Sequence, residues 1–491
     1  MNTKYDAIIV GMGPSGVFCA YELIRLGKAN NILMIEQGKR VEQRKCVSNE
    51  RQEGVSNEKQ ECASNEKREC VKCKPHCHIT TGFSGAGAFS DGKLSLYNPE
   101  DDKIYVGGDL ADYIGVTATK ELIDYTDKIY LEFGADPHTE GTEYKDEVAE
   151  IKKKAKEQKI DLINIPIRHL GTEKAKELYK RIQDYLLASN VEMRFETNVT
   201  DLIIEDGIVR GVIISNAGEE ERIYSANVVM AVGRNGANWL SKMCEKHNIM
   251  RKTGTVDLGI RYEVSDEIMK DVNKYMYEGK FVAYPEPYKD KVRTFCQNPS
   301  GFVSQELYDE DGTMLVNGHA YKKIKSTNTN FSILVSHNFK EPFNKTIQYG
   351  INIAKNANEL GNGNVLVQRL GDILRGKRTW SDELASNSLQ PTLTTAEPGD
   401  ISYALDYRTL TNILQFIKDM DKVIPGFANP ENLLYAPEIK FYSNRLVISK
   451  DFESVNISGL YSIGDGGGLT RGLMQASCSG VKMARILAEK I

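Results

Sequence analysis

The stretch Tyr5-Asp-Ala-Ile-Ile-Val-Gly-Met-Gly-Pro-Ser-Gly16 decides the fold at the start of this chain. An apolar run of strand length leads directly into three glycines, and apolar residues at helical spacing then continue up to Gly27. A second apolar run, residues 32–35, ends at Glu36. Strand, glycine turn, helix and strand in this order predict a dinucleotide-binding βαβ unit.

Each residue type in this stretch has a physical role in binding a dinucleotide. Gly11 permits the tight turn, Gly13 lets the backbone approach a pyrophosphate, and Gly16 lets the helix pack closely on the strand. The N-terminus of the helix supplies unpaired N–H groups and a positive dipole end for the anion. Glu36, which follows Gly16 by 20 residues, can accept hydrogen bonds from both ribose hydroxyls of an adenosine. The residues expected to contact the dinucleotide here are Gly11, Gly13, Pro14, Ser15, Gly16, Glu36 and Gln37.

Length and composition limit what kind of protein this is. The 491 residues exceed one ordinary core, which favours two or three domains. A net charge of -5 disfavours nucleic acid as a partner, and no apolar run approaches the roughly 18 to 20 residues that span a bilayer. The first strand begins so close to Met1 that no room is left for a signal peptide. We therefore expect a cytoplasmic protein with no membrane partner.

The pattern along the chain predicts an α/β protein in which one domain is discontinuous. Residues 1–105 form the first part of a Rossmann-like domain, and residues 106–190 form a helical segment rich in Lys and acidic side chains. Short strands with turn signals make residues 191–250 its second part. Residues 448–491 return to it with a strand, a glycine turn and a closing helix. The stretch 251–447 is expected to be an inserted substrate domain of mixed α/β (α+β) type.

Residues 47–70 contain a repeat with a period of eight residues, in three copies that each begin Val/Ala-Ser-Asn-Glu. The copies have almost no apolar side chains and therefore cannot bury a face. We expect a solvent-exposed, flexible insertion that catalysis does not need.

Two further glycine-rich stretches accompany the first motif. Gly82-Phe-Ser-Gly-Ala-Gly-Ala-Phe-Ser-Asp-Gly-Lys-Leu94 puts many small residues in one loop, which indicates backbone packed against a flat or charged group. Leu460-Tyr-Ser-Ile-Gly-Asp-Gly-Gly-Gly468 is a strand that ends in a glycine turn before the last helix, expected over residues 470–490. Together with the strand end Ala231-Val-Gly233, these stretches resemble the flavoprotein superfamily of glutathione reductase and para-hydroxybenzoate hydroxylase.

The resemblance implies FAD as the cofactor, because NAD would explain the first motif but not the C-terminal one. It narrows to a bacterial group of uncharacterised FAD-dependent dehydrogenases and covers essentially the whole chain apart from the repeat. In the superfamily, the aspartate that corresponds to Asp465 accepts a hydrogen bond from the ribityl chain, and the following helix points its N-terminus at the flavin. The further cofactor contacts expected on this basis are Gly85, Ala86, Gly87, Lys93, Val199, Gly233, Gly464, Asp465, Gly472, Leu473 and Met474.

Cysteines gather just before the second glycine-rich stretch, at Cys70, Cys73 and Cys77. With Cys46, Cys62 or a histidine as fourth ligand, they would bind an iron–sulfur cluster or Zn²⁺. A redox-active thiol pair and inert thiols are the two alternatives. A cluster at this place would suit one-electron transfer between FAD and a small electron-transfer protein.

No second Gly-x-Gly-x-x-Gly follows a central strand, so we expect no dedicated NAD(P)H domain. The sequence predicts an FAD-dependent oxidoreductase that exchanges a hydride between flavin N5 and a small-molecule substrate. The alternative is a flavin-bearing, electron-transferring or redox-sensing protein that acts with a protein partner. Candidate catalytic residues are Arg471 beside the flavin and, for orienting a substrate or moving a proton, His319 and Arg261. The competing interpretation of each is a packed, salt-bridged or solvated side chain.

Overall fold

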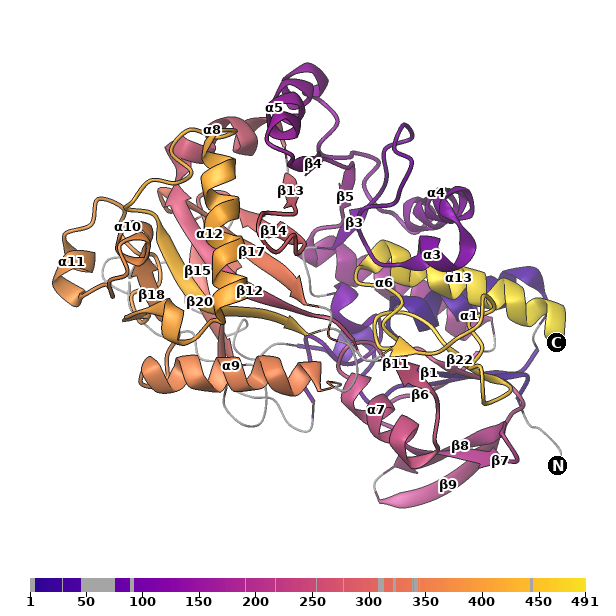
Figure 1. The fold of residues 1–491 in the computed structure, drawn as a ribbon. Helices are drawn as coiled ribbons and strands as arrows, with labels where there is room; N and C mark the ends of the chain where they lie inside the picture. Colours follow the sequence, from indigo (N-terminus) through magenta and orange to yellow (C-terminus); the bar gives the residue numbers. More distant parts are fainter. Residues whose placement is uncertain are drawn as a thin grey trace, which may run out of the picture. The chain divides into compact units, whose positions relative to one another are not determined.

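The computed structural model of the protein describes residues 5–28, 30–45, 76–88, 92–189, 191–216, 218–252, 254–276, 278–307, 313–320, 324–337, 339, 343, 345–441 and 445–491. The chain divides into two compact units (Figure 1). Unit 1 comprises residues 1–139, 167–252 and 443–491, and unit 2 comprises residues 140–166 and 253–442.

Unit 1 is built on a five-stranded sheet in which all neighbouring strands are parallel. Its strands come from three distant parts of the chain, which confirms the predicted discontinuous Rossmann-like domain. All residues of the first two strands in the sequence are buried, as expected of a parallel sheet covered on both faces. The strand order is β22 (Leu460–Ser462), β10 (Val228–Met230), β1 (Ala7–Val10), β2 (Ile32–Ile35) and β6 (Glu192–Arg194).

Helices cover one face of this sheet, and a small antiparallel sheet with one helix packs on the other. Alternate residues of β1 make the two cores, because Ile9 belongs to one apolar cluster and Ile8 to the other. The first face carries α1 (Pro14–Leu26), α3 (Leu110–Ile114), α4 (Val116–Glu132), α6 (Thr172–Ala188) and α13 (Leu473–Lys490). The second carries β7 (Asn198–Glu205), β8 (Ile208–Asn216), β9 (Glu219–Tyr224) and α7 (Ala237–Lys246).

The first and last helices of unit 1 pack against each other, and Figure 1 shows α13 (yellow) beside α1. A buried carboxylate joins them: Glu22 of α1 accepts hydrogen bonds from Arg485 of α13 (2.9 Å) and from Tyr125 of α4 (2.6 Å). Burial by itself would raise the pKa of Glu22, but the hydrogen bonds from Arg25, Tyr125 and Arg485 lower it below its ordinary value. Three helices are therefore tied at one ionised group.

Short elements complete unit 1. Strand β3 (Lys93–Ser95) pairs with β5 (Ile167–His169), and β11 (Arg251–Lys252) pairs with β21 (Arg445–Leu446). Two single turns of 3₁₀ helix, η1 (Val41–Gln43) and η2 (Gly85–Ala88), lie near the glycine-rich loop.

Unit 2 is organised by an eight-stranded sheet in which all pairs but β18–β19 are antiparallel. The central strand β12 (Val256–Ser265) has one apolar and one polar face. Leu258, Ile260 and Tyr262 on the apolar face pack against the helices of this unit. The order is β19 (Glu397–Pro398), β18 (Leu366–Arg369), β20 (Leu433–Phe441), β12 (Val256–Ser265), β17 (Asn328–His337), β14 (Val292–Asn298), β13 (Lys280–Ala283) and β4 (Asp161–Ile163).

The remaining elements of unit 2 are one hairpin and several helices. They are β15 (Phe302–Leu307), β16 (Met314–His319), α5 (Lys145–Glu157), α8 (Asp266–Tyr275), α9 (Thr346–Leu360), α10 (Leu370–Leu374), α11 (Ser381–Ala385), α12 (Tyr407–Asp421) and the 3₁₀ turn η3 (Ile401–Tyr403). Among the elements described, no helix has the length and apolar character needed to cross a membrane.

Residues 106–190, expected as one helical segment, divide between the two units. Helices α3, α4 and α6 belong to unit 1, whereas α5 and β4 belong to unit 2. The reason is the pairing of β4 with β13, a strand more than a hundred residues further along the chain. Such a pairing leaves no signal in the local sequence.

Candidate functional site

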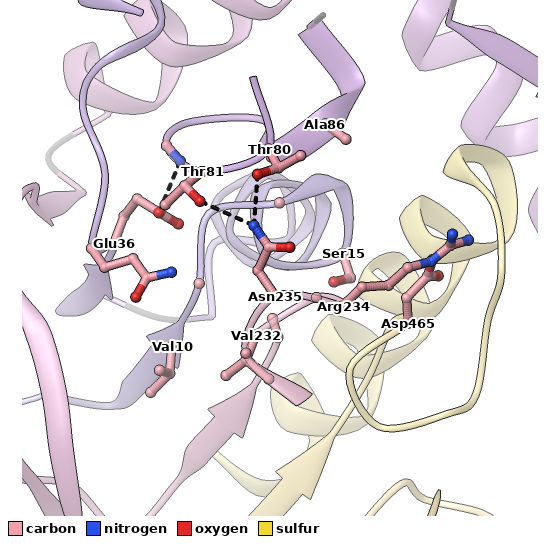
Figure 2. A pocket seen from close by; sticks show the side chains of 18 of the residues that line it. Val10, Ser15, Glu36, Thr80, Thr81, Ala86, Val232, Arg234, Asn235 and Asp465 are labelled. Atoms are coloured by element: carbon pink, nitrogen blue, oxygen red, sulfur yellow. Dashed lines mark hydrogen bonds and ion pairs between the residues drawn. The ribbon is translucent and has the colours of Figure 1, made fainter. Parts of the chain in front are cut away.

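A cavity of about 800 Å³ lies in unit 1 at the carboxyl ends of the parallel strands (Figure 2). Its wall includes the ends of β1, β2 and β10 and the turn after β22. In open α/β sheets, ligands bind in the crevice outside these strand ends. The cavity is therefore where the topology of unit 1 would place a ligand.

The first glycine turn forms one side of this cavity. Gly11 has φ +101°, and a methyl group on it would lie 2.4 Å from the carbonyl oxygen of Ala231. A methyl group on Gly16 would lie 2.1 Å from the carbonyl oxygen of Gly11, whereas one on Gly13 would meet nothing within 4 Å. Gly13 is the N-cap of α1, and no side chain in the described part of the chain caps that helix. The turn thus leaves free space in front of uncapped N–H groups, the arrangement that binds a phosphate.

Glu36 joins the first glycine turn to the second glycine-rich loop. Its carboxylate accepts hydrogen bonds from the backbone N–H of Met12 (2.9 Å), Gly38 (3.0 Å) and Gly82 (3.0 Å). The side chain lines the cavity and the residue is 7% exposed. Since a carboxylate has about four acceptor positions, these bonds leave one for a ribose hydroxyl rather than the two that the sequence suggested.

A buried arginine shapes the second loop. Arg44 has no exposed surface and donates hydrogen bonds to the carbonyl oxygens of His78 (2.9 Å), Ile79 (2.6 Å), Gly85 (2.7 Å) and Phe83. Burial lowers the pKa of the Arg44 guanidinium to about 10, although the Glu36 carboxylate acts in the opposite direction. Sequence reasoning missed Arg44, because a basic residue in a polar stretch gives no sign of burial.

The turn after β10 closes the third side. Asn235 donates to the hydroxyls of Thr80 (2.7 Å) and Thr81 (3.1 Å), which precede the second glycine loop. Arg234 donates through Nε to Oδ2 of Asp465 (3.0 Å), and the two side chains lie next to each other in Figure 2. These polar contacts were also missed, because sequence reasoning assigned only Gly233 in this turn.

Most cofactor contacts predicted from the sequence line this cavity. They are Gly11, Gly13, Pro14, Ser15, Glu36, Gln37, Gly85, Ala86, Gly87, Val199, Gly233, Asp465, Gly472 and Leu473. Gly16, Lys93, Gly464 and Met474 are not among its lining residues. Gly16 and Gly464 shape turns against their neighbours, Met474 is buried in the core, and Lys93 lies in β3.

Arg471 lies just before the last helix. Helix α13 begins at Leu473 rather than at Thr470, because Thr470 donates to Asp465 and the N–H of Arg471 donates to the carbonyl of Gly107 (2.8 Å). The guanidinium of Arg471 is paired with Asp109 at 2.9 and 3.2 Å. It is not among the residues that line the cavity.

Arg261 and His319 lie in unit 2, Arg261 on β12 and His319 at the end of β16. Arg261 has no exposed surface, and its guanidinium lies 3.0 Å from Glu438 and donates to the carbonyl of Cys296 (2.9 Å). A side chain held in this way connects strands, and the structure does not support contact between Arg261 and a substrate. His319 is exposed.

The described residues place one member of the predicted cysteine cluster. Cys77 is an exposed free thiol, while Cys70, Cys73 and the repeat at 47–70 lie outside the described residues. Within the described ranges, no three His, Cys, Asp or Glu side chains gather as metal ligands. The iron–sulfur or zinc site stays a prediction.

Comparison with known proteins finds a matching family model for a stretch of each unit. Residues 260–440 match a family model described as "FAD-dependent protein, C-terminal domain-like", and residues 165–255 match one described as "FAD binding domain". An uncharacterised protein of Clostridium beijerinckii is 24% identical over 506 residues, which cover 99% of this chain and 81% of that protein.

Solved structures also align along nearly the whole chain. Mycobacterium smegmatis Sdh1 in complex with UQ1 is 10% identical, with a TM-score of 0.41 over 99% of this chain and 68% of that one. The 3-ketosteroid-delta4-(5alpha)-dehydrogenase of Rhodococcus jostii RHA1 is 13% identical, with a TM-score of 0.40 over 99% and 97%. Two segments of the chain thus match family models of FAD-binding or FAD-dependent proteins, as its glycine motifs indicated.

Proposed function

We propose that this protein is an oxidoreductase that uses FAD to exchange a hydride with a small organic substrate. The observation that carries the proposal is the cavity of about 800 Å³ whose wall combines three glycine turns from distant parts of the chain. One turn alone would suit any dinucleotide, whereas the turn after β22 adds the carboxylate of Asp465 to the cavity wall. Bound FAD would supply a two-electron acceptor at its N5 atom.

The residues present fit FAD. Gly13 and the uncapped N-terminus of α1 offer open space and N–H donors for the diphosphate, and Glu36 keeps one acceptor position for the ribose. Asp465 has a 19% exposed side chain on the cavity wall, where its carboxylate would accept a ribityl hydroxyl. The three subsites follow three different strands of the parallel sheet, β1, β2 and β22.

The N-terminus of α13 would face the electron-accepting part of the cofactor. Its N-cap Gly472 and first residue Leu473 both line the cavity, and no described side chain caps the helix. A positive dipole end at this place stabilises negative charge, and the 18-residue helix holds it on a rigid element. Asp109 fixes Arg471 beside it.

The topology of unit 2 favours a substrate that donates or accepts hydride directly. A nicotinamide domain needs parallel strands joined by a helix after a glycine turn. In the described part of unit 2, the single parallel pair is β18–β19, and β19 has two residues. We therefore assign unit 2 to substrate binding rather than to NAD(P)H.

The test is anaerobic purification followed by a visible spectrum and a panel of reductants. We expect flavin absorbance in the protein as purified and bleaching by a member of a panel of hydroxy acids, amines and saturated acids, but not by NADH or NADPH. Rapid bleaching by NADPH alone would contradict the assignment of unit 2. Stoichiometric iron and acid-labile sulfide, with reduction only by a small redox protein, would instead favour electron transfer.

A further inference from the structure

We propose that Arg234 is the cation with which this protein binds the diphosphate of FAD. The inference rests on the proposed FAD site and adds to it a residue outside the glycine motifs. Of the residues found to line the cavity, three carry a charge, and two of these are the acids Glu36 and Asp465. Arg234 is the third, and the described lining contains no lysine and no other arginine.

The place of Arg234 is fixed by the turn that follows β10. Gly233 has φ +62°, and a methyl group on Gly236 would lie 2.5 Å from Cβ of Val232. The chain thus takes a left-handed conformation just before Arg234 and packs closely against Val232 two residues after it, which limits how the turn can move. A guanidinium carried by such a turn has a defined position at the strand end, which suits recognition of an anion.

The guanidinium is anchored and yet has donors to spare. Its Nε donates to Asp465 at 3.0 Å and its Nη2 to the carbonyl oxygen of Arg471 at 3.1 Å. Two of the five N–H donors of an arginine are used in this way, and the other three have no partner among the described residues. The side chain is 62% exposed, so a ligand can reach them.

Contacts around Asp465 connect this guanidinium to the phosphate-binding turn. Next to Asp465, a methyl group on Gly464 would lie 2.5 Å from Oγ of Ser15, in the first turn of α1. On the other side of Asp465, a methyl group on Gly466 would lie 2.5 Å from the carbonyl oxygen of Gly233. The residue that precedes Asp465 thus packs against the first turn of α1. The helix supplies N–H groups and the arginine supplies a full charge for the same anion.

The charges of the cavity lining also favour Arg234 as a ligand of the diphosphate. Without Arg234, the lining described here would present two carboxylates to a diphosphate that carries about two negative charges, and like charges repel. The helix terminus offers roughly half an elementary charge in compensation. A cation would offset this repulsion, and Arg234 is the basic residue that the described lining contains.

The experiment compares ADP and adenosine as probes, because they differ in the diphosphate alone. Their dissociation constants are measured by calorimetry on the full-length protein after its flavin has been removed by dialysis. A charged hydrogen bond lost in Arg234→Ala should weaken ADP binding by about 10- to 100-fold and leave adenosine binding within about twofold. Arg181→Ala is the matched control, since Arg181 is an exposed arginine of α6 outside the cavity lining.

A further variant keeps the test decisive if Arg234→Ala folds poorly. Arg234→Lys keeps the positive charge and should bind ADP more weakly than the wild type but more tightly than Arg234→Ala. Equal weakening of ADP and adenosine, or none, would show that Arg234 only ties two turns together and would overturn the proposal. If the wild-type protein neither carries flavin nor binds FAD, it is the proposed function that fails.

Discussion

Replacing Gly13 by alanine separates the binding role of a glycine from its structural role. Gly13 has φ −72°, which any residue adopts, and an added methyl group meets no atom within 4 Å. The change at this helix N-cap should cost at most about 1 kcal/mol of folding free energy. Because Gly13 lines the cavity, the methyl group enters the space of the ligand. Overpacking of about 1–3 kcal/mol should then raise the Kd for FAD by roughly 5- to 150-fold.

Gly16→Ala is the matched variant with the opposite outcome. Its methyl group would lie 2.1 Å from the carbonyl oxygen of Gly11, and no side-chain rotation can relieve a contact with backbone. Alanine stabilises a helix by about 1 kcal/mol relative to glycine. Relieving so close a contact with the backbone should cost about 3 kcal/mol, the upper end of the range for overpacking. We expect a net loss of about 2 kcal/mol in the free energy of unfolding.

Both variants are measured by urea denaturation of the flavin-free protein and by titration of FAD, followed through flavin fluorescence. The expected pattern is stable but weakly binding for Gly13→Ala, and unstable for Gly16→Ala. A Gly13→Ala protein that binds FAD as tightly as the wild type would refute the placement of the diphosphate. One that unfolds as easily as Gly16→Ala would refute the structural argument.

Four other changes have defined outcomes. Burial lowers the pKa of His337 below its ordinary value of 6.5, so the unfolded chain binds a proton more readily than the folded one. The urea midpoint should therefore fall as the pH drops below about 6.5, and His337→Gln should make it less dependent on pH. Arg261→Met should destabilise the protein by about 1–3 kcal/mol in urea denaturation, because it removes the partner of one buried oxygen of Glu438, whose other oxygen keeps Lys440 at 3.3 Å. A variant of unchanged stability with altered turnover would instead support a catalytic role for Arg261. Arg44→Met should lose FAD and about 3 kcal/mol or more of stability, since four backbone carbonyls between His78 and Gly85 lose their donor. An unchanged flavin content would contradict this. Deletion of residues 47–62 should leave the ratio of flavin to protein absorbance unchanged, and a colourless product would show that the repeat is structural.

Local patterns predicted the parts of the fold that local physics determines. Strand β1, helix α1 and strand β2 lie where the apolar spacing and the glycines placed them, because each is defined by its neighbours in sequence. The strands β6 to β10 were also found from alternation and turn residues. Helix α13 was found too, although its start was placed three residues early.

Long-range pairing and burial were not accessible in this way. The position of β4 beside β13 depends on a partner that the local sequence does not specify. Arg44 and Arg261 are both fully buried, yet in sequence they look like ordinary surface or catalytic cations. Arg234 was missed because an exposed arginine after a strand looks like any surface residue in the sequence. Only the structure shows that it is paired with Asp465.

The order of strands in unit 1 has a consequence for how the protein is made. Strand β22 lies at the edge of the sheet next to β10, and α13 packs on α1. Residues 7–26 therefore cannot complete their packing until residues 460–490 have been synthesised. On the ribosome, the whole of unit 2 emerges between them. Until residues 460–487 are released, α1 lacks its neighbour and an apolar sheet edge stays uncovered. We expect nascent chains to retain flavin only once residues 460–490 have left the ribosome, and mutations in α13 to lower the yield of folded protein before they change its activity.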